Sequence, residues 1–268
     1  MQDKNKLLIS IVTVVYNGEE FLEKTIQSVI NQTYENIEYI IVDGGSSDGT
    51  VDIIKKYEDD IDYWVSEKDE GIYDAMNKGA KLATGDFINF MNADDIIYSH
   101  DAVELIVDNI HDMDSTYYSR ARIVSDTFTW IYPAIDVQNY SKWLNLNLPN
   151  HQTIFFSKRF YKSILYDLRL SLTADDDYKL FALESGKVMF IDVVFVEFKR
   201  GGVSSNHKSY KLFFQRIKES YIRNFKHKRW IRFIIDPVKL TLMFLVNFIF
   251  GDENFSRFLK MIDLVKKT

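Results

Sequence analysis

The chain of 268 residues contains no cysteine and only 3 prolines. Without cysteine it has no disulfide, no Cys-ligated zinc, no iron–sulfur cluster and no catalytic thiol. The scarcity of proline excludes collagen-like and proline-rich low-complexity chains. Hydrophobic residues make up 46% of the chain and aromatic residues 15%, which is enough for a bulky core. The sequence is therefore that of a globular protein, with the length of one large domain or of one domain plus an appendage.

The signatures of several common enzyme classes are also absent. No G-x-G-x-x-G follows the first apolar run and no G-x-x-x-x-G-K-[ST] occurs, which disfavours dinucleotide oxidoreductases and P-loop NTPases. The 5 histidines form no H-E-x-x-H pair, which disfavours zinc hydrolases. A G-x-S-x-G nucleophile elbow is missing as well. The chemistry of this protein must come from another arrangement of polar residues.

Charge is unevenly distributed along the chain, whose formal net charge is −6. Residues 207–232 contain nine Lys and Arg but a single Glu, a net of +8, whereas residues 1–206 carry a net of −15. Aromatic residues are interleaved with the basic ones, as in helices that lie on an anionic membrane surface. Packing of this segment on the body is the alternative, and the acidic body argues against nucleic acid as a partner. We expect contact with a membrane surface through residues 206–250.

No segment has the length and apolarity of a membrane-spanning helix. The uncharged run Leu240–Phe250 falls short of the about 20 apolar residues that a spanning helix needs, and Asp236 and Pro237 interrupt its upstream side. No signal-peptide pattern follows Met1, and the lack of cysteine fits a reducing compartment. We therefore expect a cytoplasmic protein, peripheral on the inner face of the cell membrane, whose tail forms two or three helices.

The first hundred residues alternate between strand-like and helix-like patterns. Apolar runs bounded by polar turns predict buried strands at residues 7–15 and 37–42, and two further strands at residues 62–65 and 87–91. Apolar residues at helical spacing predict helices after Asn17, which would be an N-cap, and at residues 51–57 and 72–83. Strand–helix units of this length predict an α/β fold with a parallel sheet and right-handed crossovers.

Three polar turns follow strands of this predicted sheet. They are Tyr16-Asn17-Gly18, the segment from Asp43 to Thr50, and the segment from Asn92 to Asp95. Parallel strands bring their carboxyl ends to one edge of a sheet, which is where ligands bind in such folds. Acidic residues there are suited to hold a divalent cation or to accept hydrogen bonds from a nucleoside. Their common location predicts the functional site.

The motifs resemble those of glycosyltransferase family 2. Asn92-Ala93-Asp94-Asp95 resembles the D-x-D element of nucleotide-sugar-dependent transferases, where a divalent cation offsets the charge of the leaving diphosphate. The segments Ile11–Gly18, Asp43–Thr50 and Ser66–Gly79 precede it in the family's order. The resemblance implies a GT-A fold, Rossmann-like, with a mostly parallel central sheet flanked by helices. It also implies an inverting transferase of the bacterial surface-polysaccharide type, using Mn²⁺ or Mg²⁺.

The resemblance also implies roles for individual residues. Tyr16 would lie by the base, and Asp43 would accept from a base N–H. Asp94 and Asp95 would hold the metal, although Asn92 stands where the family commonly has Asp, so an amide replaces a full charge. The donor-binding residues implied are Tyr16, Asn17, Asp43, Asp69, Asp74, Asn92 and Asp94.

The second half of the chain is expected to supply the acceptor site and the base. His151, in a Pro-x-His-Gln string before an apolar strand, is a candidate acceptor contact. Asp175, Asp176 and Asp177 open a predicted helix, where acids also serve as caps. Resemblance to the family's acidic pair followed by an aromatic favours Asp177 as the catalytic base with Asp176 as its neighbour. The double glycine at 201–202 is predicted to form either a lid over the donor or a simple hinge.

We thus expect a GT-A glycosyltransferase domain at 1–205 and a basic amphipathic helical tail at 206–268. The predicted reaction moves a sugar from a nucleoside-diphosphate sugar, commonly a UDP-sugar, to a hydroxyl of a glycan or lipid-linked glycan acceptor. Three alternatives remain: transfer to a polyprenyl phosphate itself, a non-catalytic sugar-nucleotide-binding protein, and a nucleotidyltransferase. The donor sugar, the acceptor and the oligomeric state are not determined at this stage.

Overall fold

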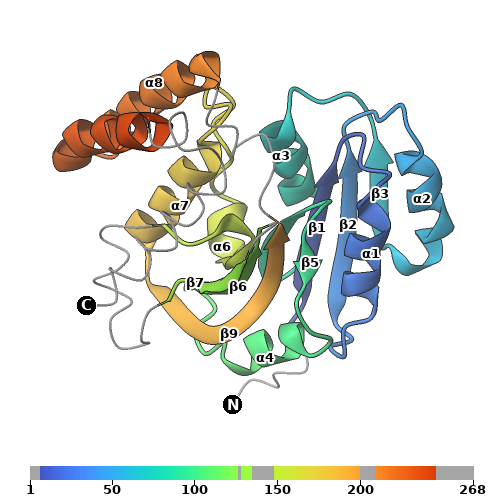
Figure 1. Cartoon of the computed structure of the whole chain (residues 1–268). Helices are drawn as coiled ribbons and strands as arrows, with labels where there is room; N and C mark the ends of the chain where they lie inside the picture. Colours follow the sequence, from blue (N-terminus) through green and yellow to red (C-terminus); the bar gives the residue numbers. More distant parts are fainter. Residues whose placement is uncertain (1–6, 126–127, 135–147, 200–208, 246–268) are drawn as a thin grey trace.

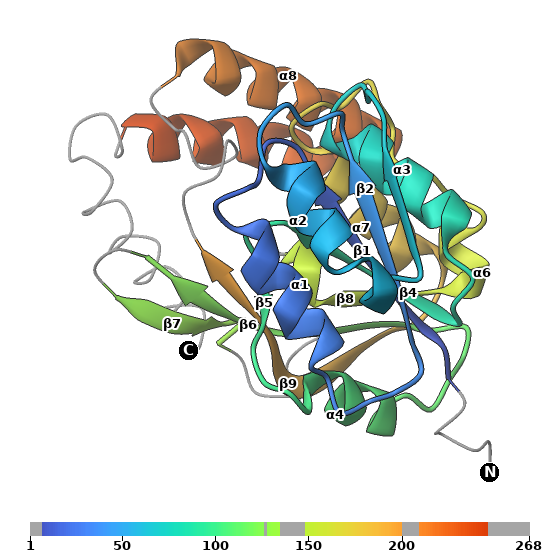
Figure 2. The same cartoon turned by 90° about the vertical axis from the view of Figure 1, so that its right-hand side faces the viewer.

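The computed structural model describes residues 7–125, 128–134, 148–199 and 209–245 (Figures 1 and 2). Its first half is a layer of parallel strands with helices on both sides. The strands are β1 (Ile9–Val15), β2 (Ile37–Asp43), β3 (Tyr63–Ser66) and β4 (Phe87–Asn92), in the spatial order β3-β2-β1-β4. The helices between them are α1 (Leu22–Ile30), α2 (Thr50–Lys56) and α3 (Ile72–Leu82), with a 3₁₀ turn η2 (Glu58–Asp60) before β3.

The central strand explains why this half folds as it does. Every residue of β1 is buried, as its nearly continuous apolar sequence predicts. Ile9 and Ile11 join the core on the side of α1, whereas Val12 and Val14 join the core on the side of α3, because successive side chains point to opposite faces. The four predicted strands are confirmed. The N-cap prediction for Asn17 is wrong, since α1 begins at Leu22 and Asn17 adopts a left-handed φ of 49° in the preceding loop.

The second half continues the sheet and curls it (Figure 1). Its strands are β5 (Ile96–Ile97), β6 (Thr116–Val124), β7 (Thr129–Tyr132), β8 (Ile154–Ser157) and β9 (Val188–Lys199). Antiparallel β8 joins β4 to β6, and β6 pairs in parallel with the long β9, which also bonds β5. Helices α4 (Ala102–Asp108), α6 (Lys158–Tyr161) and α7 (Ala174–Ser185) and the 3₁₀ turn η4 (His151–Thr153) complete this half. The predicted α/β class with helices flanking the sheet is confirmed.

Where the structure describes the C-terminal tail, at residues 209–245, the chain forms helices, as predicted. Helix α8 (Tyr210–Lys226) is followed by a second helix that starts at Trp230 and reaches the end of the described residues at 245. Both lie beside α7 rather than apart from the body (Figures 1 and 2). Within the described ranges, no helix combines the length and apolarity needed to cross a membrane. The division at residue 205 stays a prediction, and the double glycine at 201–202 lies outside the described residues.

Candidate active site

The loops after β1 and β2 are locked together at the carboxyl edge of the sheet. The Asn17 amide oxygen accepts from the backbone N–H of Ser47 at 2.9 Å, and the Asn17 N–H donates to the Ser46 hydroxyl at 2.7 Å. Gly18 N–H donates to the Thr50 hydroxyl at 2.8 Å. Asn17 therefore shapes the loop, and Tyr16 next to it is left 65% exposed. An exposed aromatic ring on a rigid loop is suited to stack against a flat base.

Asp43, at the end of β2, is fully buried beneath these loops. One carboxylate oxygen accepts from the N–H groups of Gly45 and Ser46, at 3.2 and 3.0 Å, and from the Ser66 hydroxyl at 2.5 Å. The Ser46 hydroxyl donates to the other oxygen. Gly45 has a φ of +81°, a conformation that favours glycine. The chain itself thus occupies most of the acceptor positions of Asp43, and a base N–H would have to share or replace one of these bonds.

Asp69 and Asp74 order the third loop, between β3 and α3. Asp69 accepts from Gly71 N–H at 2.9 Å, and a Cβ added to Gly44 would lie 2.4 Å from its other oxygen. Asp69 therefore stands directly over the loop after β2, and only glycine at 44 leaves room for it. Asp74 accepts from Glu70 N–H at 3.2 Å and pairs with Lys78 at 3.7 Å. Of the two, Asp69 is the one placed against the donor-side loops.

The end of β4 holds the acidic segment. Asp95 is fully buried, and one of its oxygens accepts from Asn92 N–H at 3.3 Å. Burial and the charge of Asp94 raise the pKa of Asp95 well above its usual range. Burial also raises the pKa of Asp94, with Lys199 opposing the shift. Both shifts mean that each carboxylate is short of a compensating positive charge.

Two buried oxygens in this segment find no hydrogen-bond donor among the described residues: Oδ1 of Asn92 and Oδ1 of Asp95. Unsatisfied buried oxygens next to under-compensated carboxylates are what a hard divalent cation would bind. The described residues contain no group of three or more His, Asp or Glu arranged to hold a metal by themselves. The residues present fit a cation that takes its remaining ligands from a diphosphate and water, as Mg²⁺ commonly does.

His151 lies on the other side of β4, within an aromatic cluster. Its Nε2 is 2.7 Å from the Tyr166 hydroxyl, and its ring is 5.7 Å from that of Phe90. Burial lowers the pKa of His151 to about 4, so the ring is neutral at pH 7. A buried neutral ring is not suited to pair with a diphosphate by charge. A contact with the acceptor stays a prediction.

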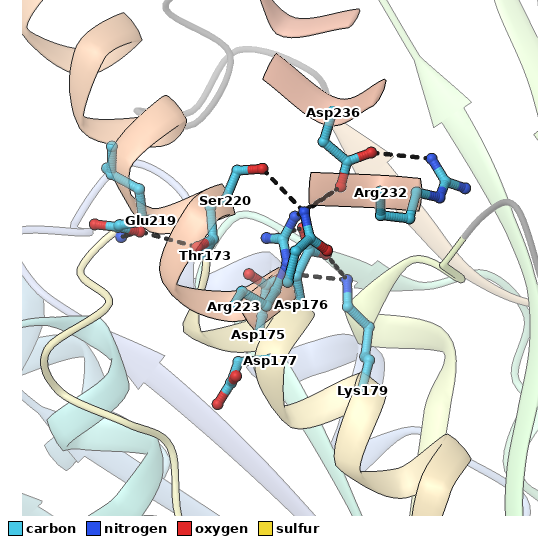
Figure 3. A network of polar contacts seen from close by, with 12 residues as sticks. Thr173, Asp175, Asp176, Asp177, Lys179, Glu219, Ser220, Arg223, Arg232 and Asp236 are labelled. Carbon is cyan, nitrogen blue, oxygen red and sulfur yellow. Dashed lines mark hydrogen bonds and ion pairs between the residues drawn. The ribbon is translucent and has the colours of Figure 1, made fainter. Parts of the chain in front are cut away.

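Successive residues of a helix are rotated by about 100°, so the three aspartates at the start of α7 have different partners, although Asp175 and Asp176 share Lys179. Asp175 faces the donor side: it accepts from the Tyr73 hydroxyl of α3 at 3.0 Å and from Lys179 at 3.0 Å. Asp176 pairs with Lys179 at 2.9 Å and with Arg223 of α8 at 3.1 Å. Figure 3 shows the carboxylate of Asp177 directed away from that of Asp176.

Asp177, favoured by the sequence as the base, is 2% exposed and bound at both oxygens. Lys226 pairs with one oxygen at 2.7 Å and His227 Nε2 lies 2.9 Å from the other. Burial opposes the charged form of His227, but bonds to Asp177 and Glu184 outweigh it and raise the pKa of the ring. Burial likewise opposes ionisation of Asp176, yet Lys179 and Arg223 hold its pKa well below the usual range. The tail thus neutralises two of the three carboxylates.

Two features of this site were not predicted from the sequence. One is Tyr73, which connects the α3 motif to Asp175 across 102 residues of sequence. The other is the set of tail residues that contact the triplet. Three adjacent acidic residues need positively charged partners, and the segment with a net charge of +8 supplies them. The spacing of its basic residues does not indicate which of them face the body.

The curled sheet with this acidic edge is that of a GT-A glycosyltransferase. S. aureus TarS residues 1–349, in complex with UDP-GlcNAc, align with a TM-score of 0.63 at 16% identity, over 81% of this chain and 66% of that one. A mannosyltransferase from Pyrobaculum calidifontis, in complex with GDP-Man and Mn²⁺, aligns with a TM-score of 0.62 at 15% identity, over 83% of this chain and 64% of that one. These likenesses confirm the predicted fold.

Sequence similarity identifies the family. The family model described as glycosyl transferase family 2 matches residues 10–169, so the chain belongs to that family. A relative from Mycobacterium bovis (strain BCG / Pasteur 1173P2), described as a PGL/p-HBAD biosynthesis glycosyltransferase, is 29% identical over 80% of this chain and 85% of its own length. The protein is therefore a glycosyltransferase, as predicted.

Proposed function

We propose that the protein transfers one sugar, with inversion, from a nucleoside-diphosphate sugar to a hydroxyl of a lipid-linked glycan acceptor. The observation that supports a nucleotide-sugar donor is the rigid polar edge of the sheet. There, exposed Tyr16 lies above buried Asp43, next to the acidic segment after β4. The similar solved structures are bound to UDP-GlcNAc and to GDP-Man, which supports a nucleotide-sugar donor without fixing its base. We retain UDP as the first donor nucleotide to test.

Asp94 and Asp95 would hold Mn²⁺ or Mg²⁺, with the amide oxygen of Asn92 as a neutral third group. The bound cation would stabilise the negative charge of the departing diphosphate. The chain's own contribution is to hold these oxygens at the tip of a buried strand, where they need not reorganise during the reaction. The raised pKa values of both carboxyls support this arrangement, because a cation would restore their charged forms.

For the general base we propose Asp175 instead of Asp177. The base must reach the acceptor hydroxyl and take its proton as that oxygen bonds to the anomeric carbon and the diphosphate departs from the opposite face. Asp175 is bound to Tyr73 on the donor side and to Lys179 of its own helix, and its side chain is 26% exposed. Asp177 is 2% exposed, with both oxygens held by the tail. Asp176 and Asp177 would then hold the tail in place.

The exposed face of the tail supports a membrane location for the acceptor. Large apolar side chains on this face stand in solvent, including Phe214 at 64%, Phe225 at 64% and Ile231 at 75% exposure. Lys211 and Lys218 lie among them on α8. An apolar face with lysines fits the headgroup region of an anionic membrane. The protein would then be peripheral on the inner, cytoplasmic face of the cell membrane.

The first experiment is calorimetric binding of UDP with and without Mn²⁺, to the wild type and to Asp94→Ala. We expect Mn²⁺-dependent binding that is lost in the variant. A screen of UDP-glucose, UDP-galactose, UDP-GlcNAc and GDP-mannose would follow, with release of nucleoside diphosphate as the readout. Absence of UDP binding under both conditions would overturn the UDP assignment, and absence of nucleoside-diphosphate release from all four nucleotide sugars would overturn the donor proposal.

The base assignment is tested by Asp175→Asn and Asp177→Asn with the donor that the screen selects. We expect Asp175→Asn to lower turnover by about 10²–10⁴-fold with donor affinity unchanged, the usual range for loss of a general base. A larger loss in Asp177→Asn, with the protein still folded, would return the role to Asp177. Turnover that neither substitution lowers would overturn the base assignment, and donor binding without turnover in the wild type would favour a role without catalysis.

A further inference from the structure

The side of α8 that faces the body is polar. Its buried residues follow helical spacing i, i+3, i+4, i+7, i+8 and i+11, which defines one continuous stripe. They are Arg216, Glu219, Ser220, Arg223, Asn224 and His227, the last being the residue that ends the helix. We call these six residues the polar stripe. A buried polar stripe is costly unless its partners are well placed, so its contacts indicate what it does.

One end of the polar stripe holds the segment that leads into α7. The Glu219 carboxylate accepts from the backbone N–H groups of Ser171 and Leu172, each at 3.1 Å. It also accepts from the Thr173 hydroxyl at 2.9 Å, and Thr173 is the residue that precedes the first turn of α7 (Figure 3). Glu219 is 3% exposed, so these bonds form away from water. The start of α7, and with it the acidic triplet, is fixed by a residue of the tail.

The other end of the polar stripe holds the triplet itself. Arg223 pairs with Asp176 at 3.1 Å, and His227 lies 2.9 Å from Asp177, whose other oxygen pairs with Lys226 at 2.7 Å. Arg223 is in turn held 3.6 Å from Asp236 of the following helix, which also accepts from Asn224 at 2.9 Å. Figure 3 shows the part of this network that Asp176, Arg223 and Asp236 form between α7 and the two tail helices. The two described tail helices are therefore connected to two of the three carboxylates.

We propose that the tail is part of the catalytic centre, and that Glu219 and Arg223 are positioning residues for Asp175. This inference rests on the proposed function in that Asp175 acts on the acceptor. Asp175 receives its Tyr73 bond only if α7 has the observed rotation about its axis, and the tail sets that rotation through Asp176, Asp177 and the residues before α7. Because the opposite face of the same helix is the exposed apolar one, docking of that face on a membrane would order the triplet.

The test uses the full chain with Glu219→Ala, Arg223→Gln and Arg223→Lys, and Lys55→Gln, at an exposed lysine of α2, as the control. The readouts are Mn²⁺-dependent UDP affinity, and the turnover and KM for hydrolysis of the donor selected above, with water as acceptor. We expect Glu219→Ala and Arg223→Gln to lower turnover about 10- to 100-fold, as small misplacements of a catalytic group do. UDP affinity and donor KM should stay within about twofold, Arg223→Lys should recover part of the loss, and Lys55→Gln should match the wild type.

A second readout does not depend on turnover. Hydrogen–deuterium exchange of residues 171–182 should be faster in Arg223→Gln than in the wild type, and phosphatidylglycerol vesicles should slow it in the wild type but less in the variant. Wild-type turnover in Glu219→Ala and Arg223→Gln would overturn the positioning role, as would equal losses of turnover and UDP affinity. Exchange of 171–182 that vesicles leave unchanged would overturn the coupling to the membrane. Failure of the proposed function is separate, because it would appear as wild-type protein without donor binding.

Discussion

Helices α1 and α8 are both amphipathic, but they face the body with opposite sides. In α1 the inward residues are Leu22, Ile26 and Val29, which are at most 2% exposed, next to a buried threonine. In α8 the inward residues are charged or polar, and the apolar side chains of Phe214 and Phe225 face outward. Water alone favours the first arrangement, because burial of apolar area stabilises a fold. The second arrangement requires strong polar partners on the inside and another apolar environment on the outside.

The two helices therefore differ in what holds them. α1 is held by apolar contacts that any well-packed neighbour can supply. α8 is held by specific bonds to α7, namely those of Glu219, Arg223 and His227. Breaking one such bond leaves a buried partner unpaired, which costs more than the bond contributed while intact. The tail should therefore respond to single charge changes, and the body to changes in side-chain volume.

The largest expected difference in stability is between substitutions in the buried apolar face of α1 and in the exposed apolar face of α8. Leu22→Ala, in the buried face of α1, should lower the free energy of unfolding by about 2–5 kcal/mol, because it leaves a cavity in the core. Phe225→Ala, in the exposed face of α8, should change it by about 0.5 kcal/mol or less in the absence of lipid. Urea unfolding followed by circular dichroism measures both. Similar losses of unfolding free energy in the two variants would mean that Phe225 is buried in solution. The contrast between the apolar faces of α1 and α8 would then be wrong.

The next largest effect is the loss of stability when the ion pair between Arg223 and Asp176 is broken. Arg223→Gln should cost about 2–3 kcal/mol, less than for a fully buried pair, because the side chain of Asp176 is 33% exposed. Adding Asp176→Asn should recover part of that loss, since the carboxylate no longer lacks a partner. A double-mutant cycle from thermal unfolding gives the coupling. Strict additivity of the two changes would show that the pair contributes nothing to the docking of α8.

A smaller effect comes from pH acting on His227. The ring faces Asp177 and Glu184 of α7, with Lys226 on Asp177 and Arg229 also interacting with Glu184. Its pKa is raised in the folded protein, so its stabilisation is fully present below the unfolded value of about 6.5 and is lost as pH rises through the folded value. The Tm difference between wild type and His227→Gln should therefore be largest near pH 6 and narrow toward pH 9. A difference that grows with pH would contradict this sign.

The smallest effect concerns the exposed lysines of α8. Lys218→Gln should weaken binding to vesicles containing phosphatidylglycerol by about 1 kcal/mol, or roughly fivefold, and added salt should reduce the difference. Its effect on unfolding should be negligible, because Lys218 is exposed. Vesicle co-sedimentation at two salt concentrations measures the change, with phosphatidylcholine vesicles as the uncharged comparison. Equal binding of wild type and variant at low salt would count against the lysine contribution.

Much of the donor side follows from local sequence. Four strands, the turns after three of them and the acidic segment at Asn92–Asp95 were all predictable, because strand periodicity and turn chemistry depend on neighbouring residues. The placement of Asn17 was not, since its side chain bonds to Ser47, 30 residues away. The roles of Asp43 and Asp69 as acceptors for their own loops depend likewise on contacts between separate turns.

The sequence by itself determined the α/β fold, the family and the position of the polar edge, because continuous apolar strands and glycine-rich turns permit few other arrangements. Only the tertiary structure decided which aspartate of the triplet faces the donor side and which face of α8 is buried. Adjacent residues of a helix differ by about 100° in direction, so a change in the rotation of α7 would exchange Asp175 for Asp176 or Asp177. That rotation is set by Glu219, Arg223 and His227, which approach from a helix more than 40 residues later in the chain.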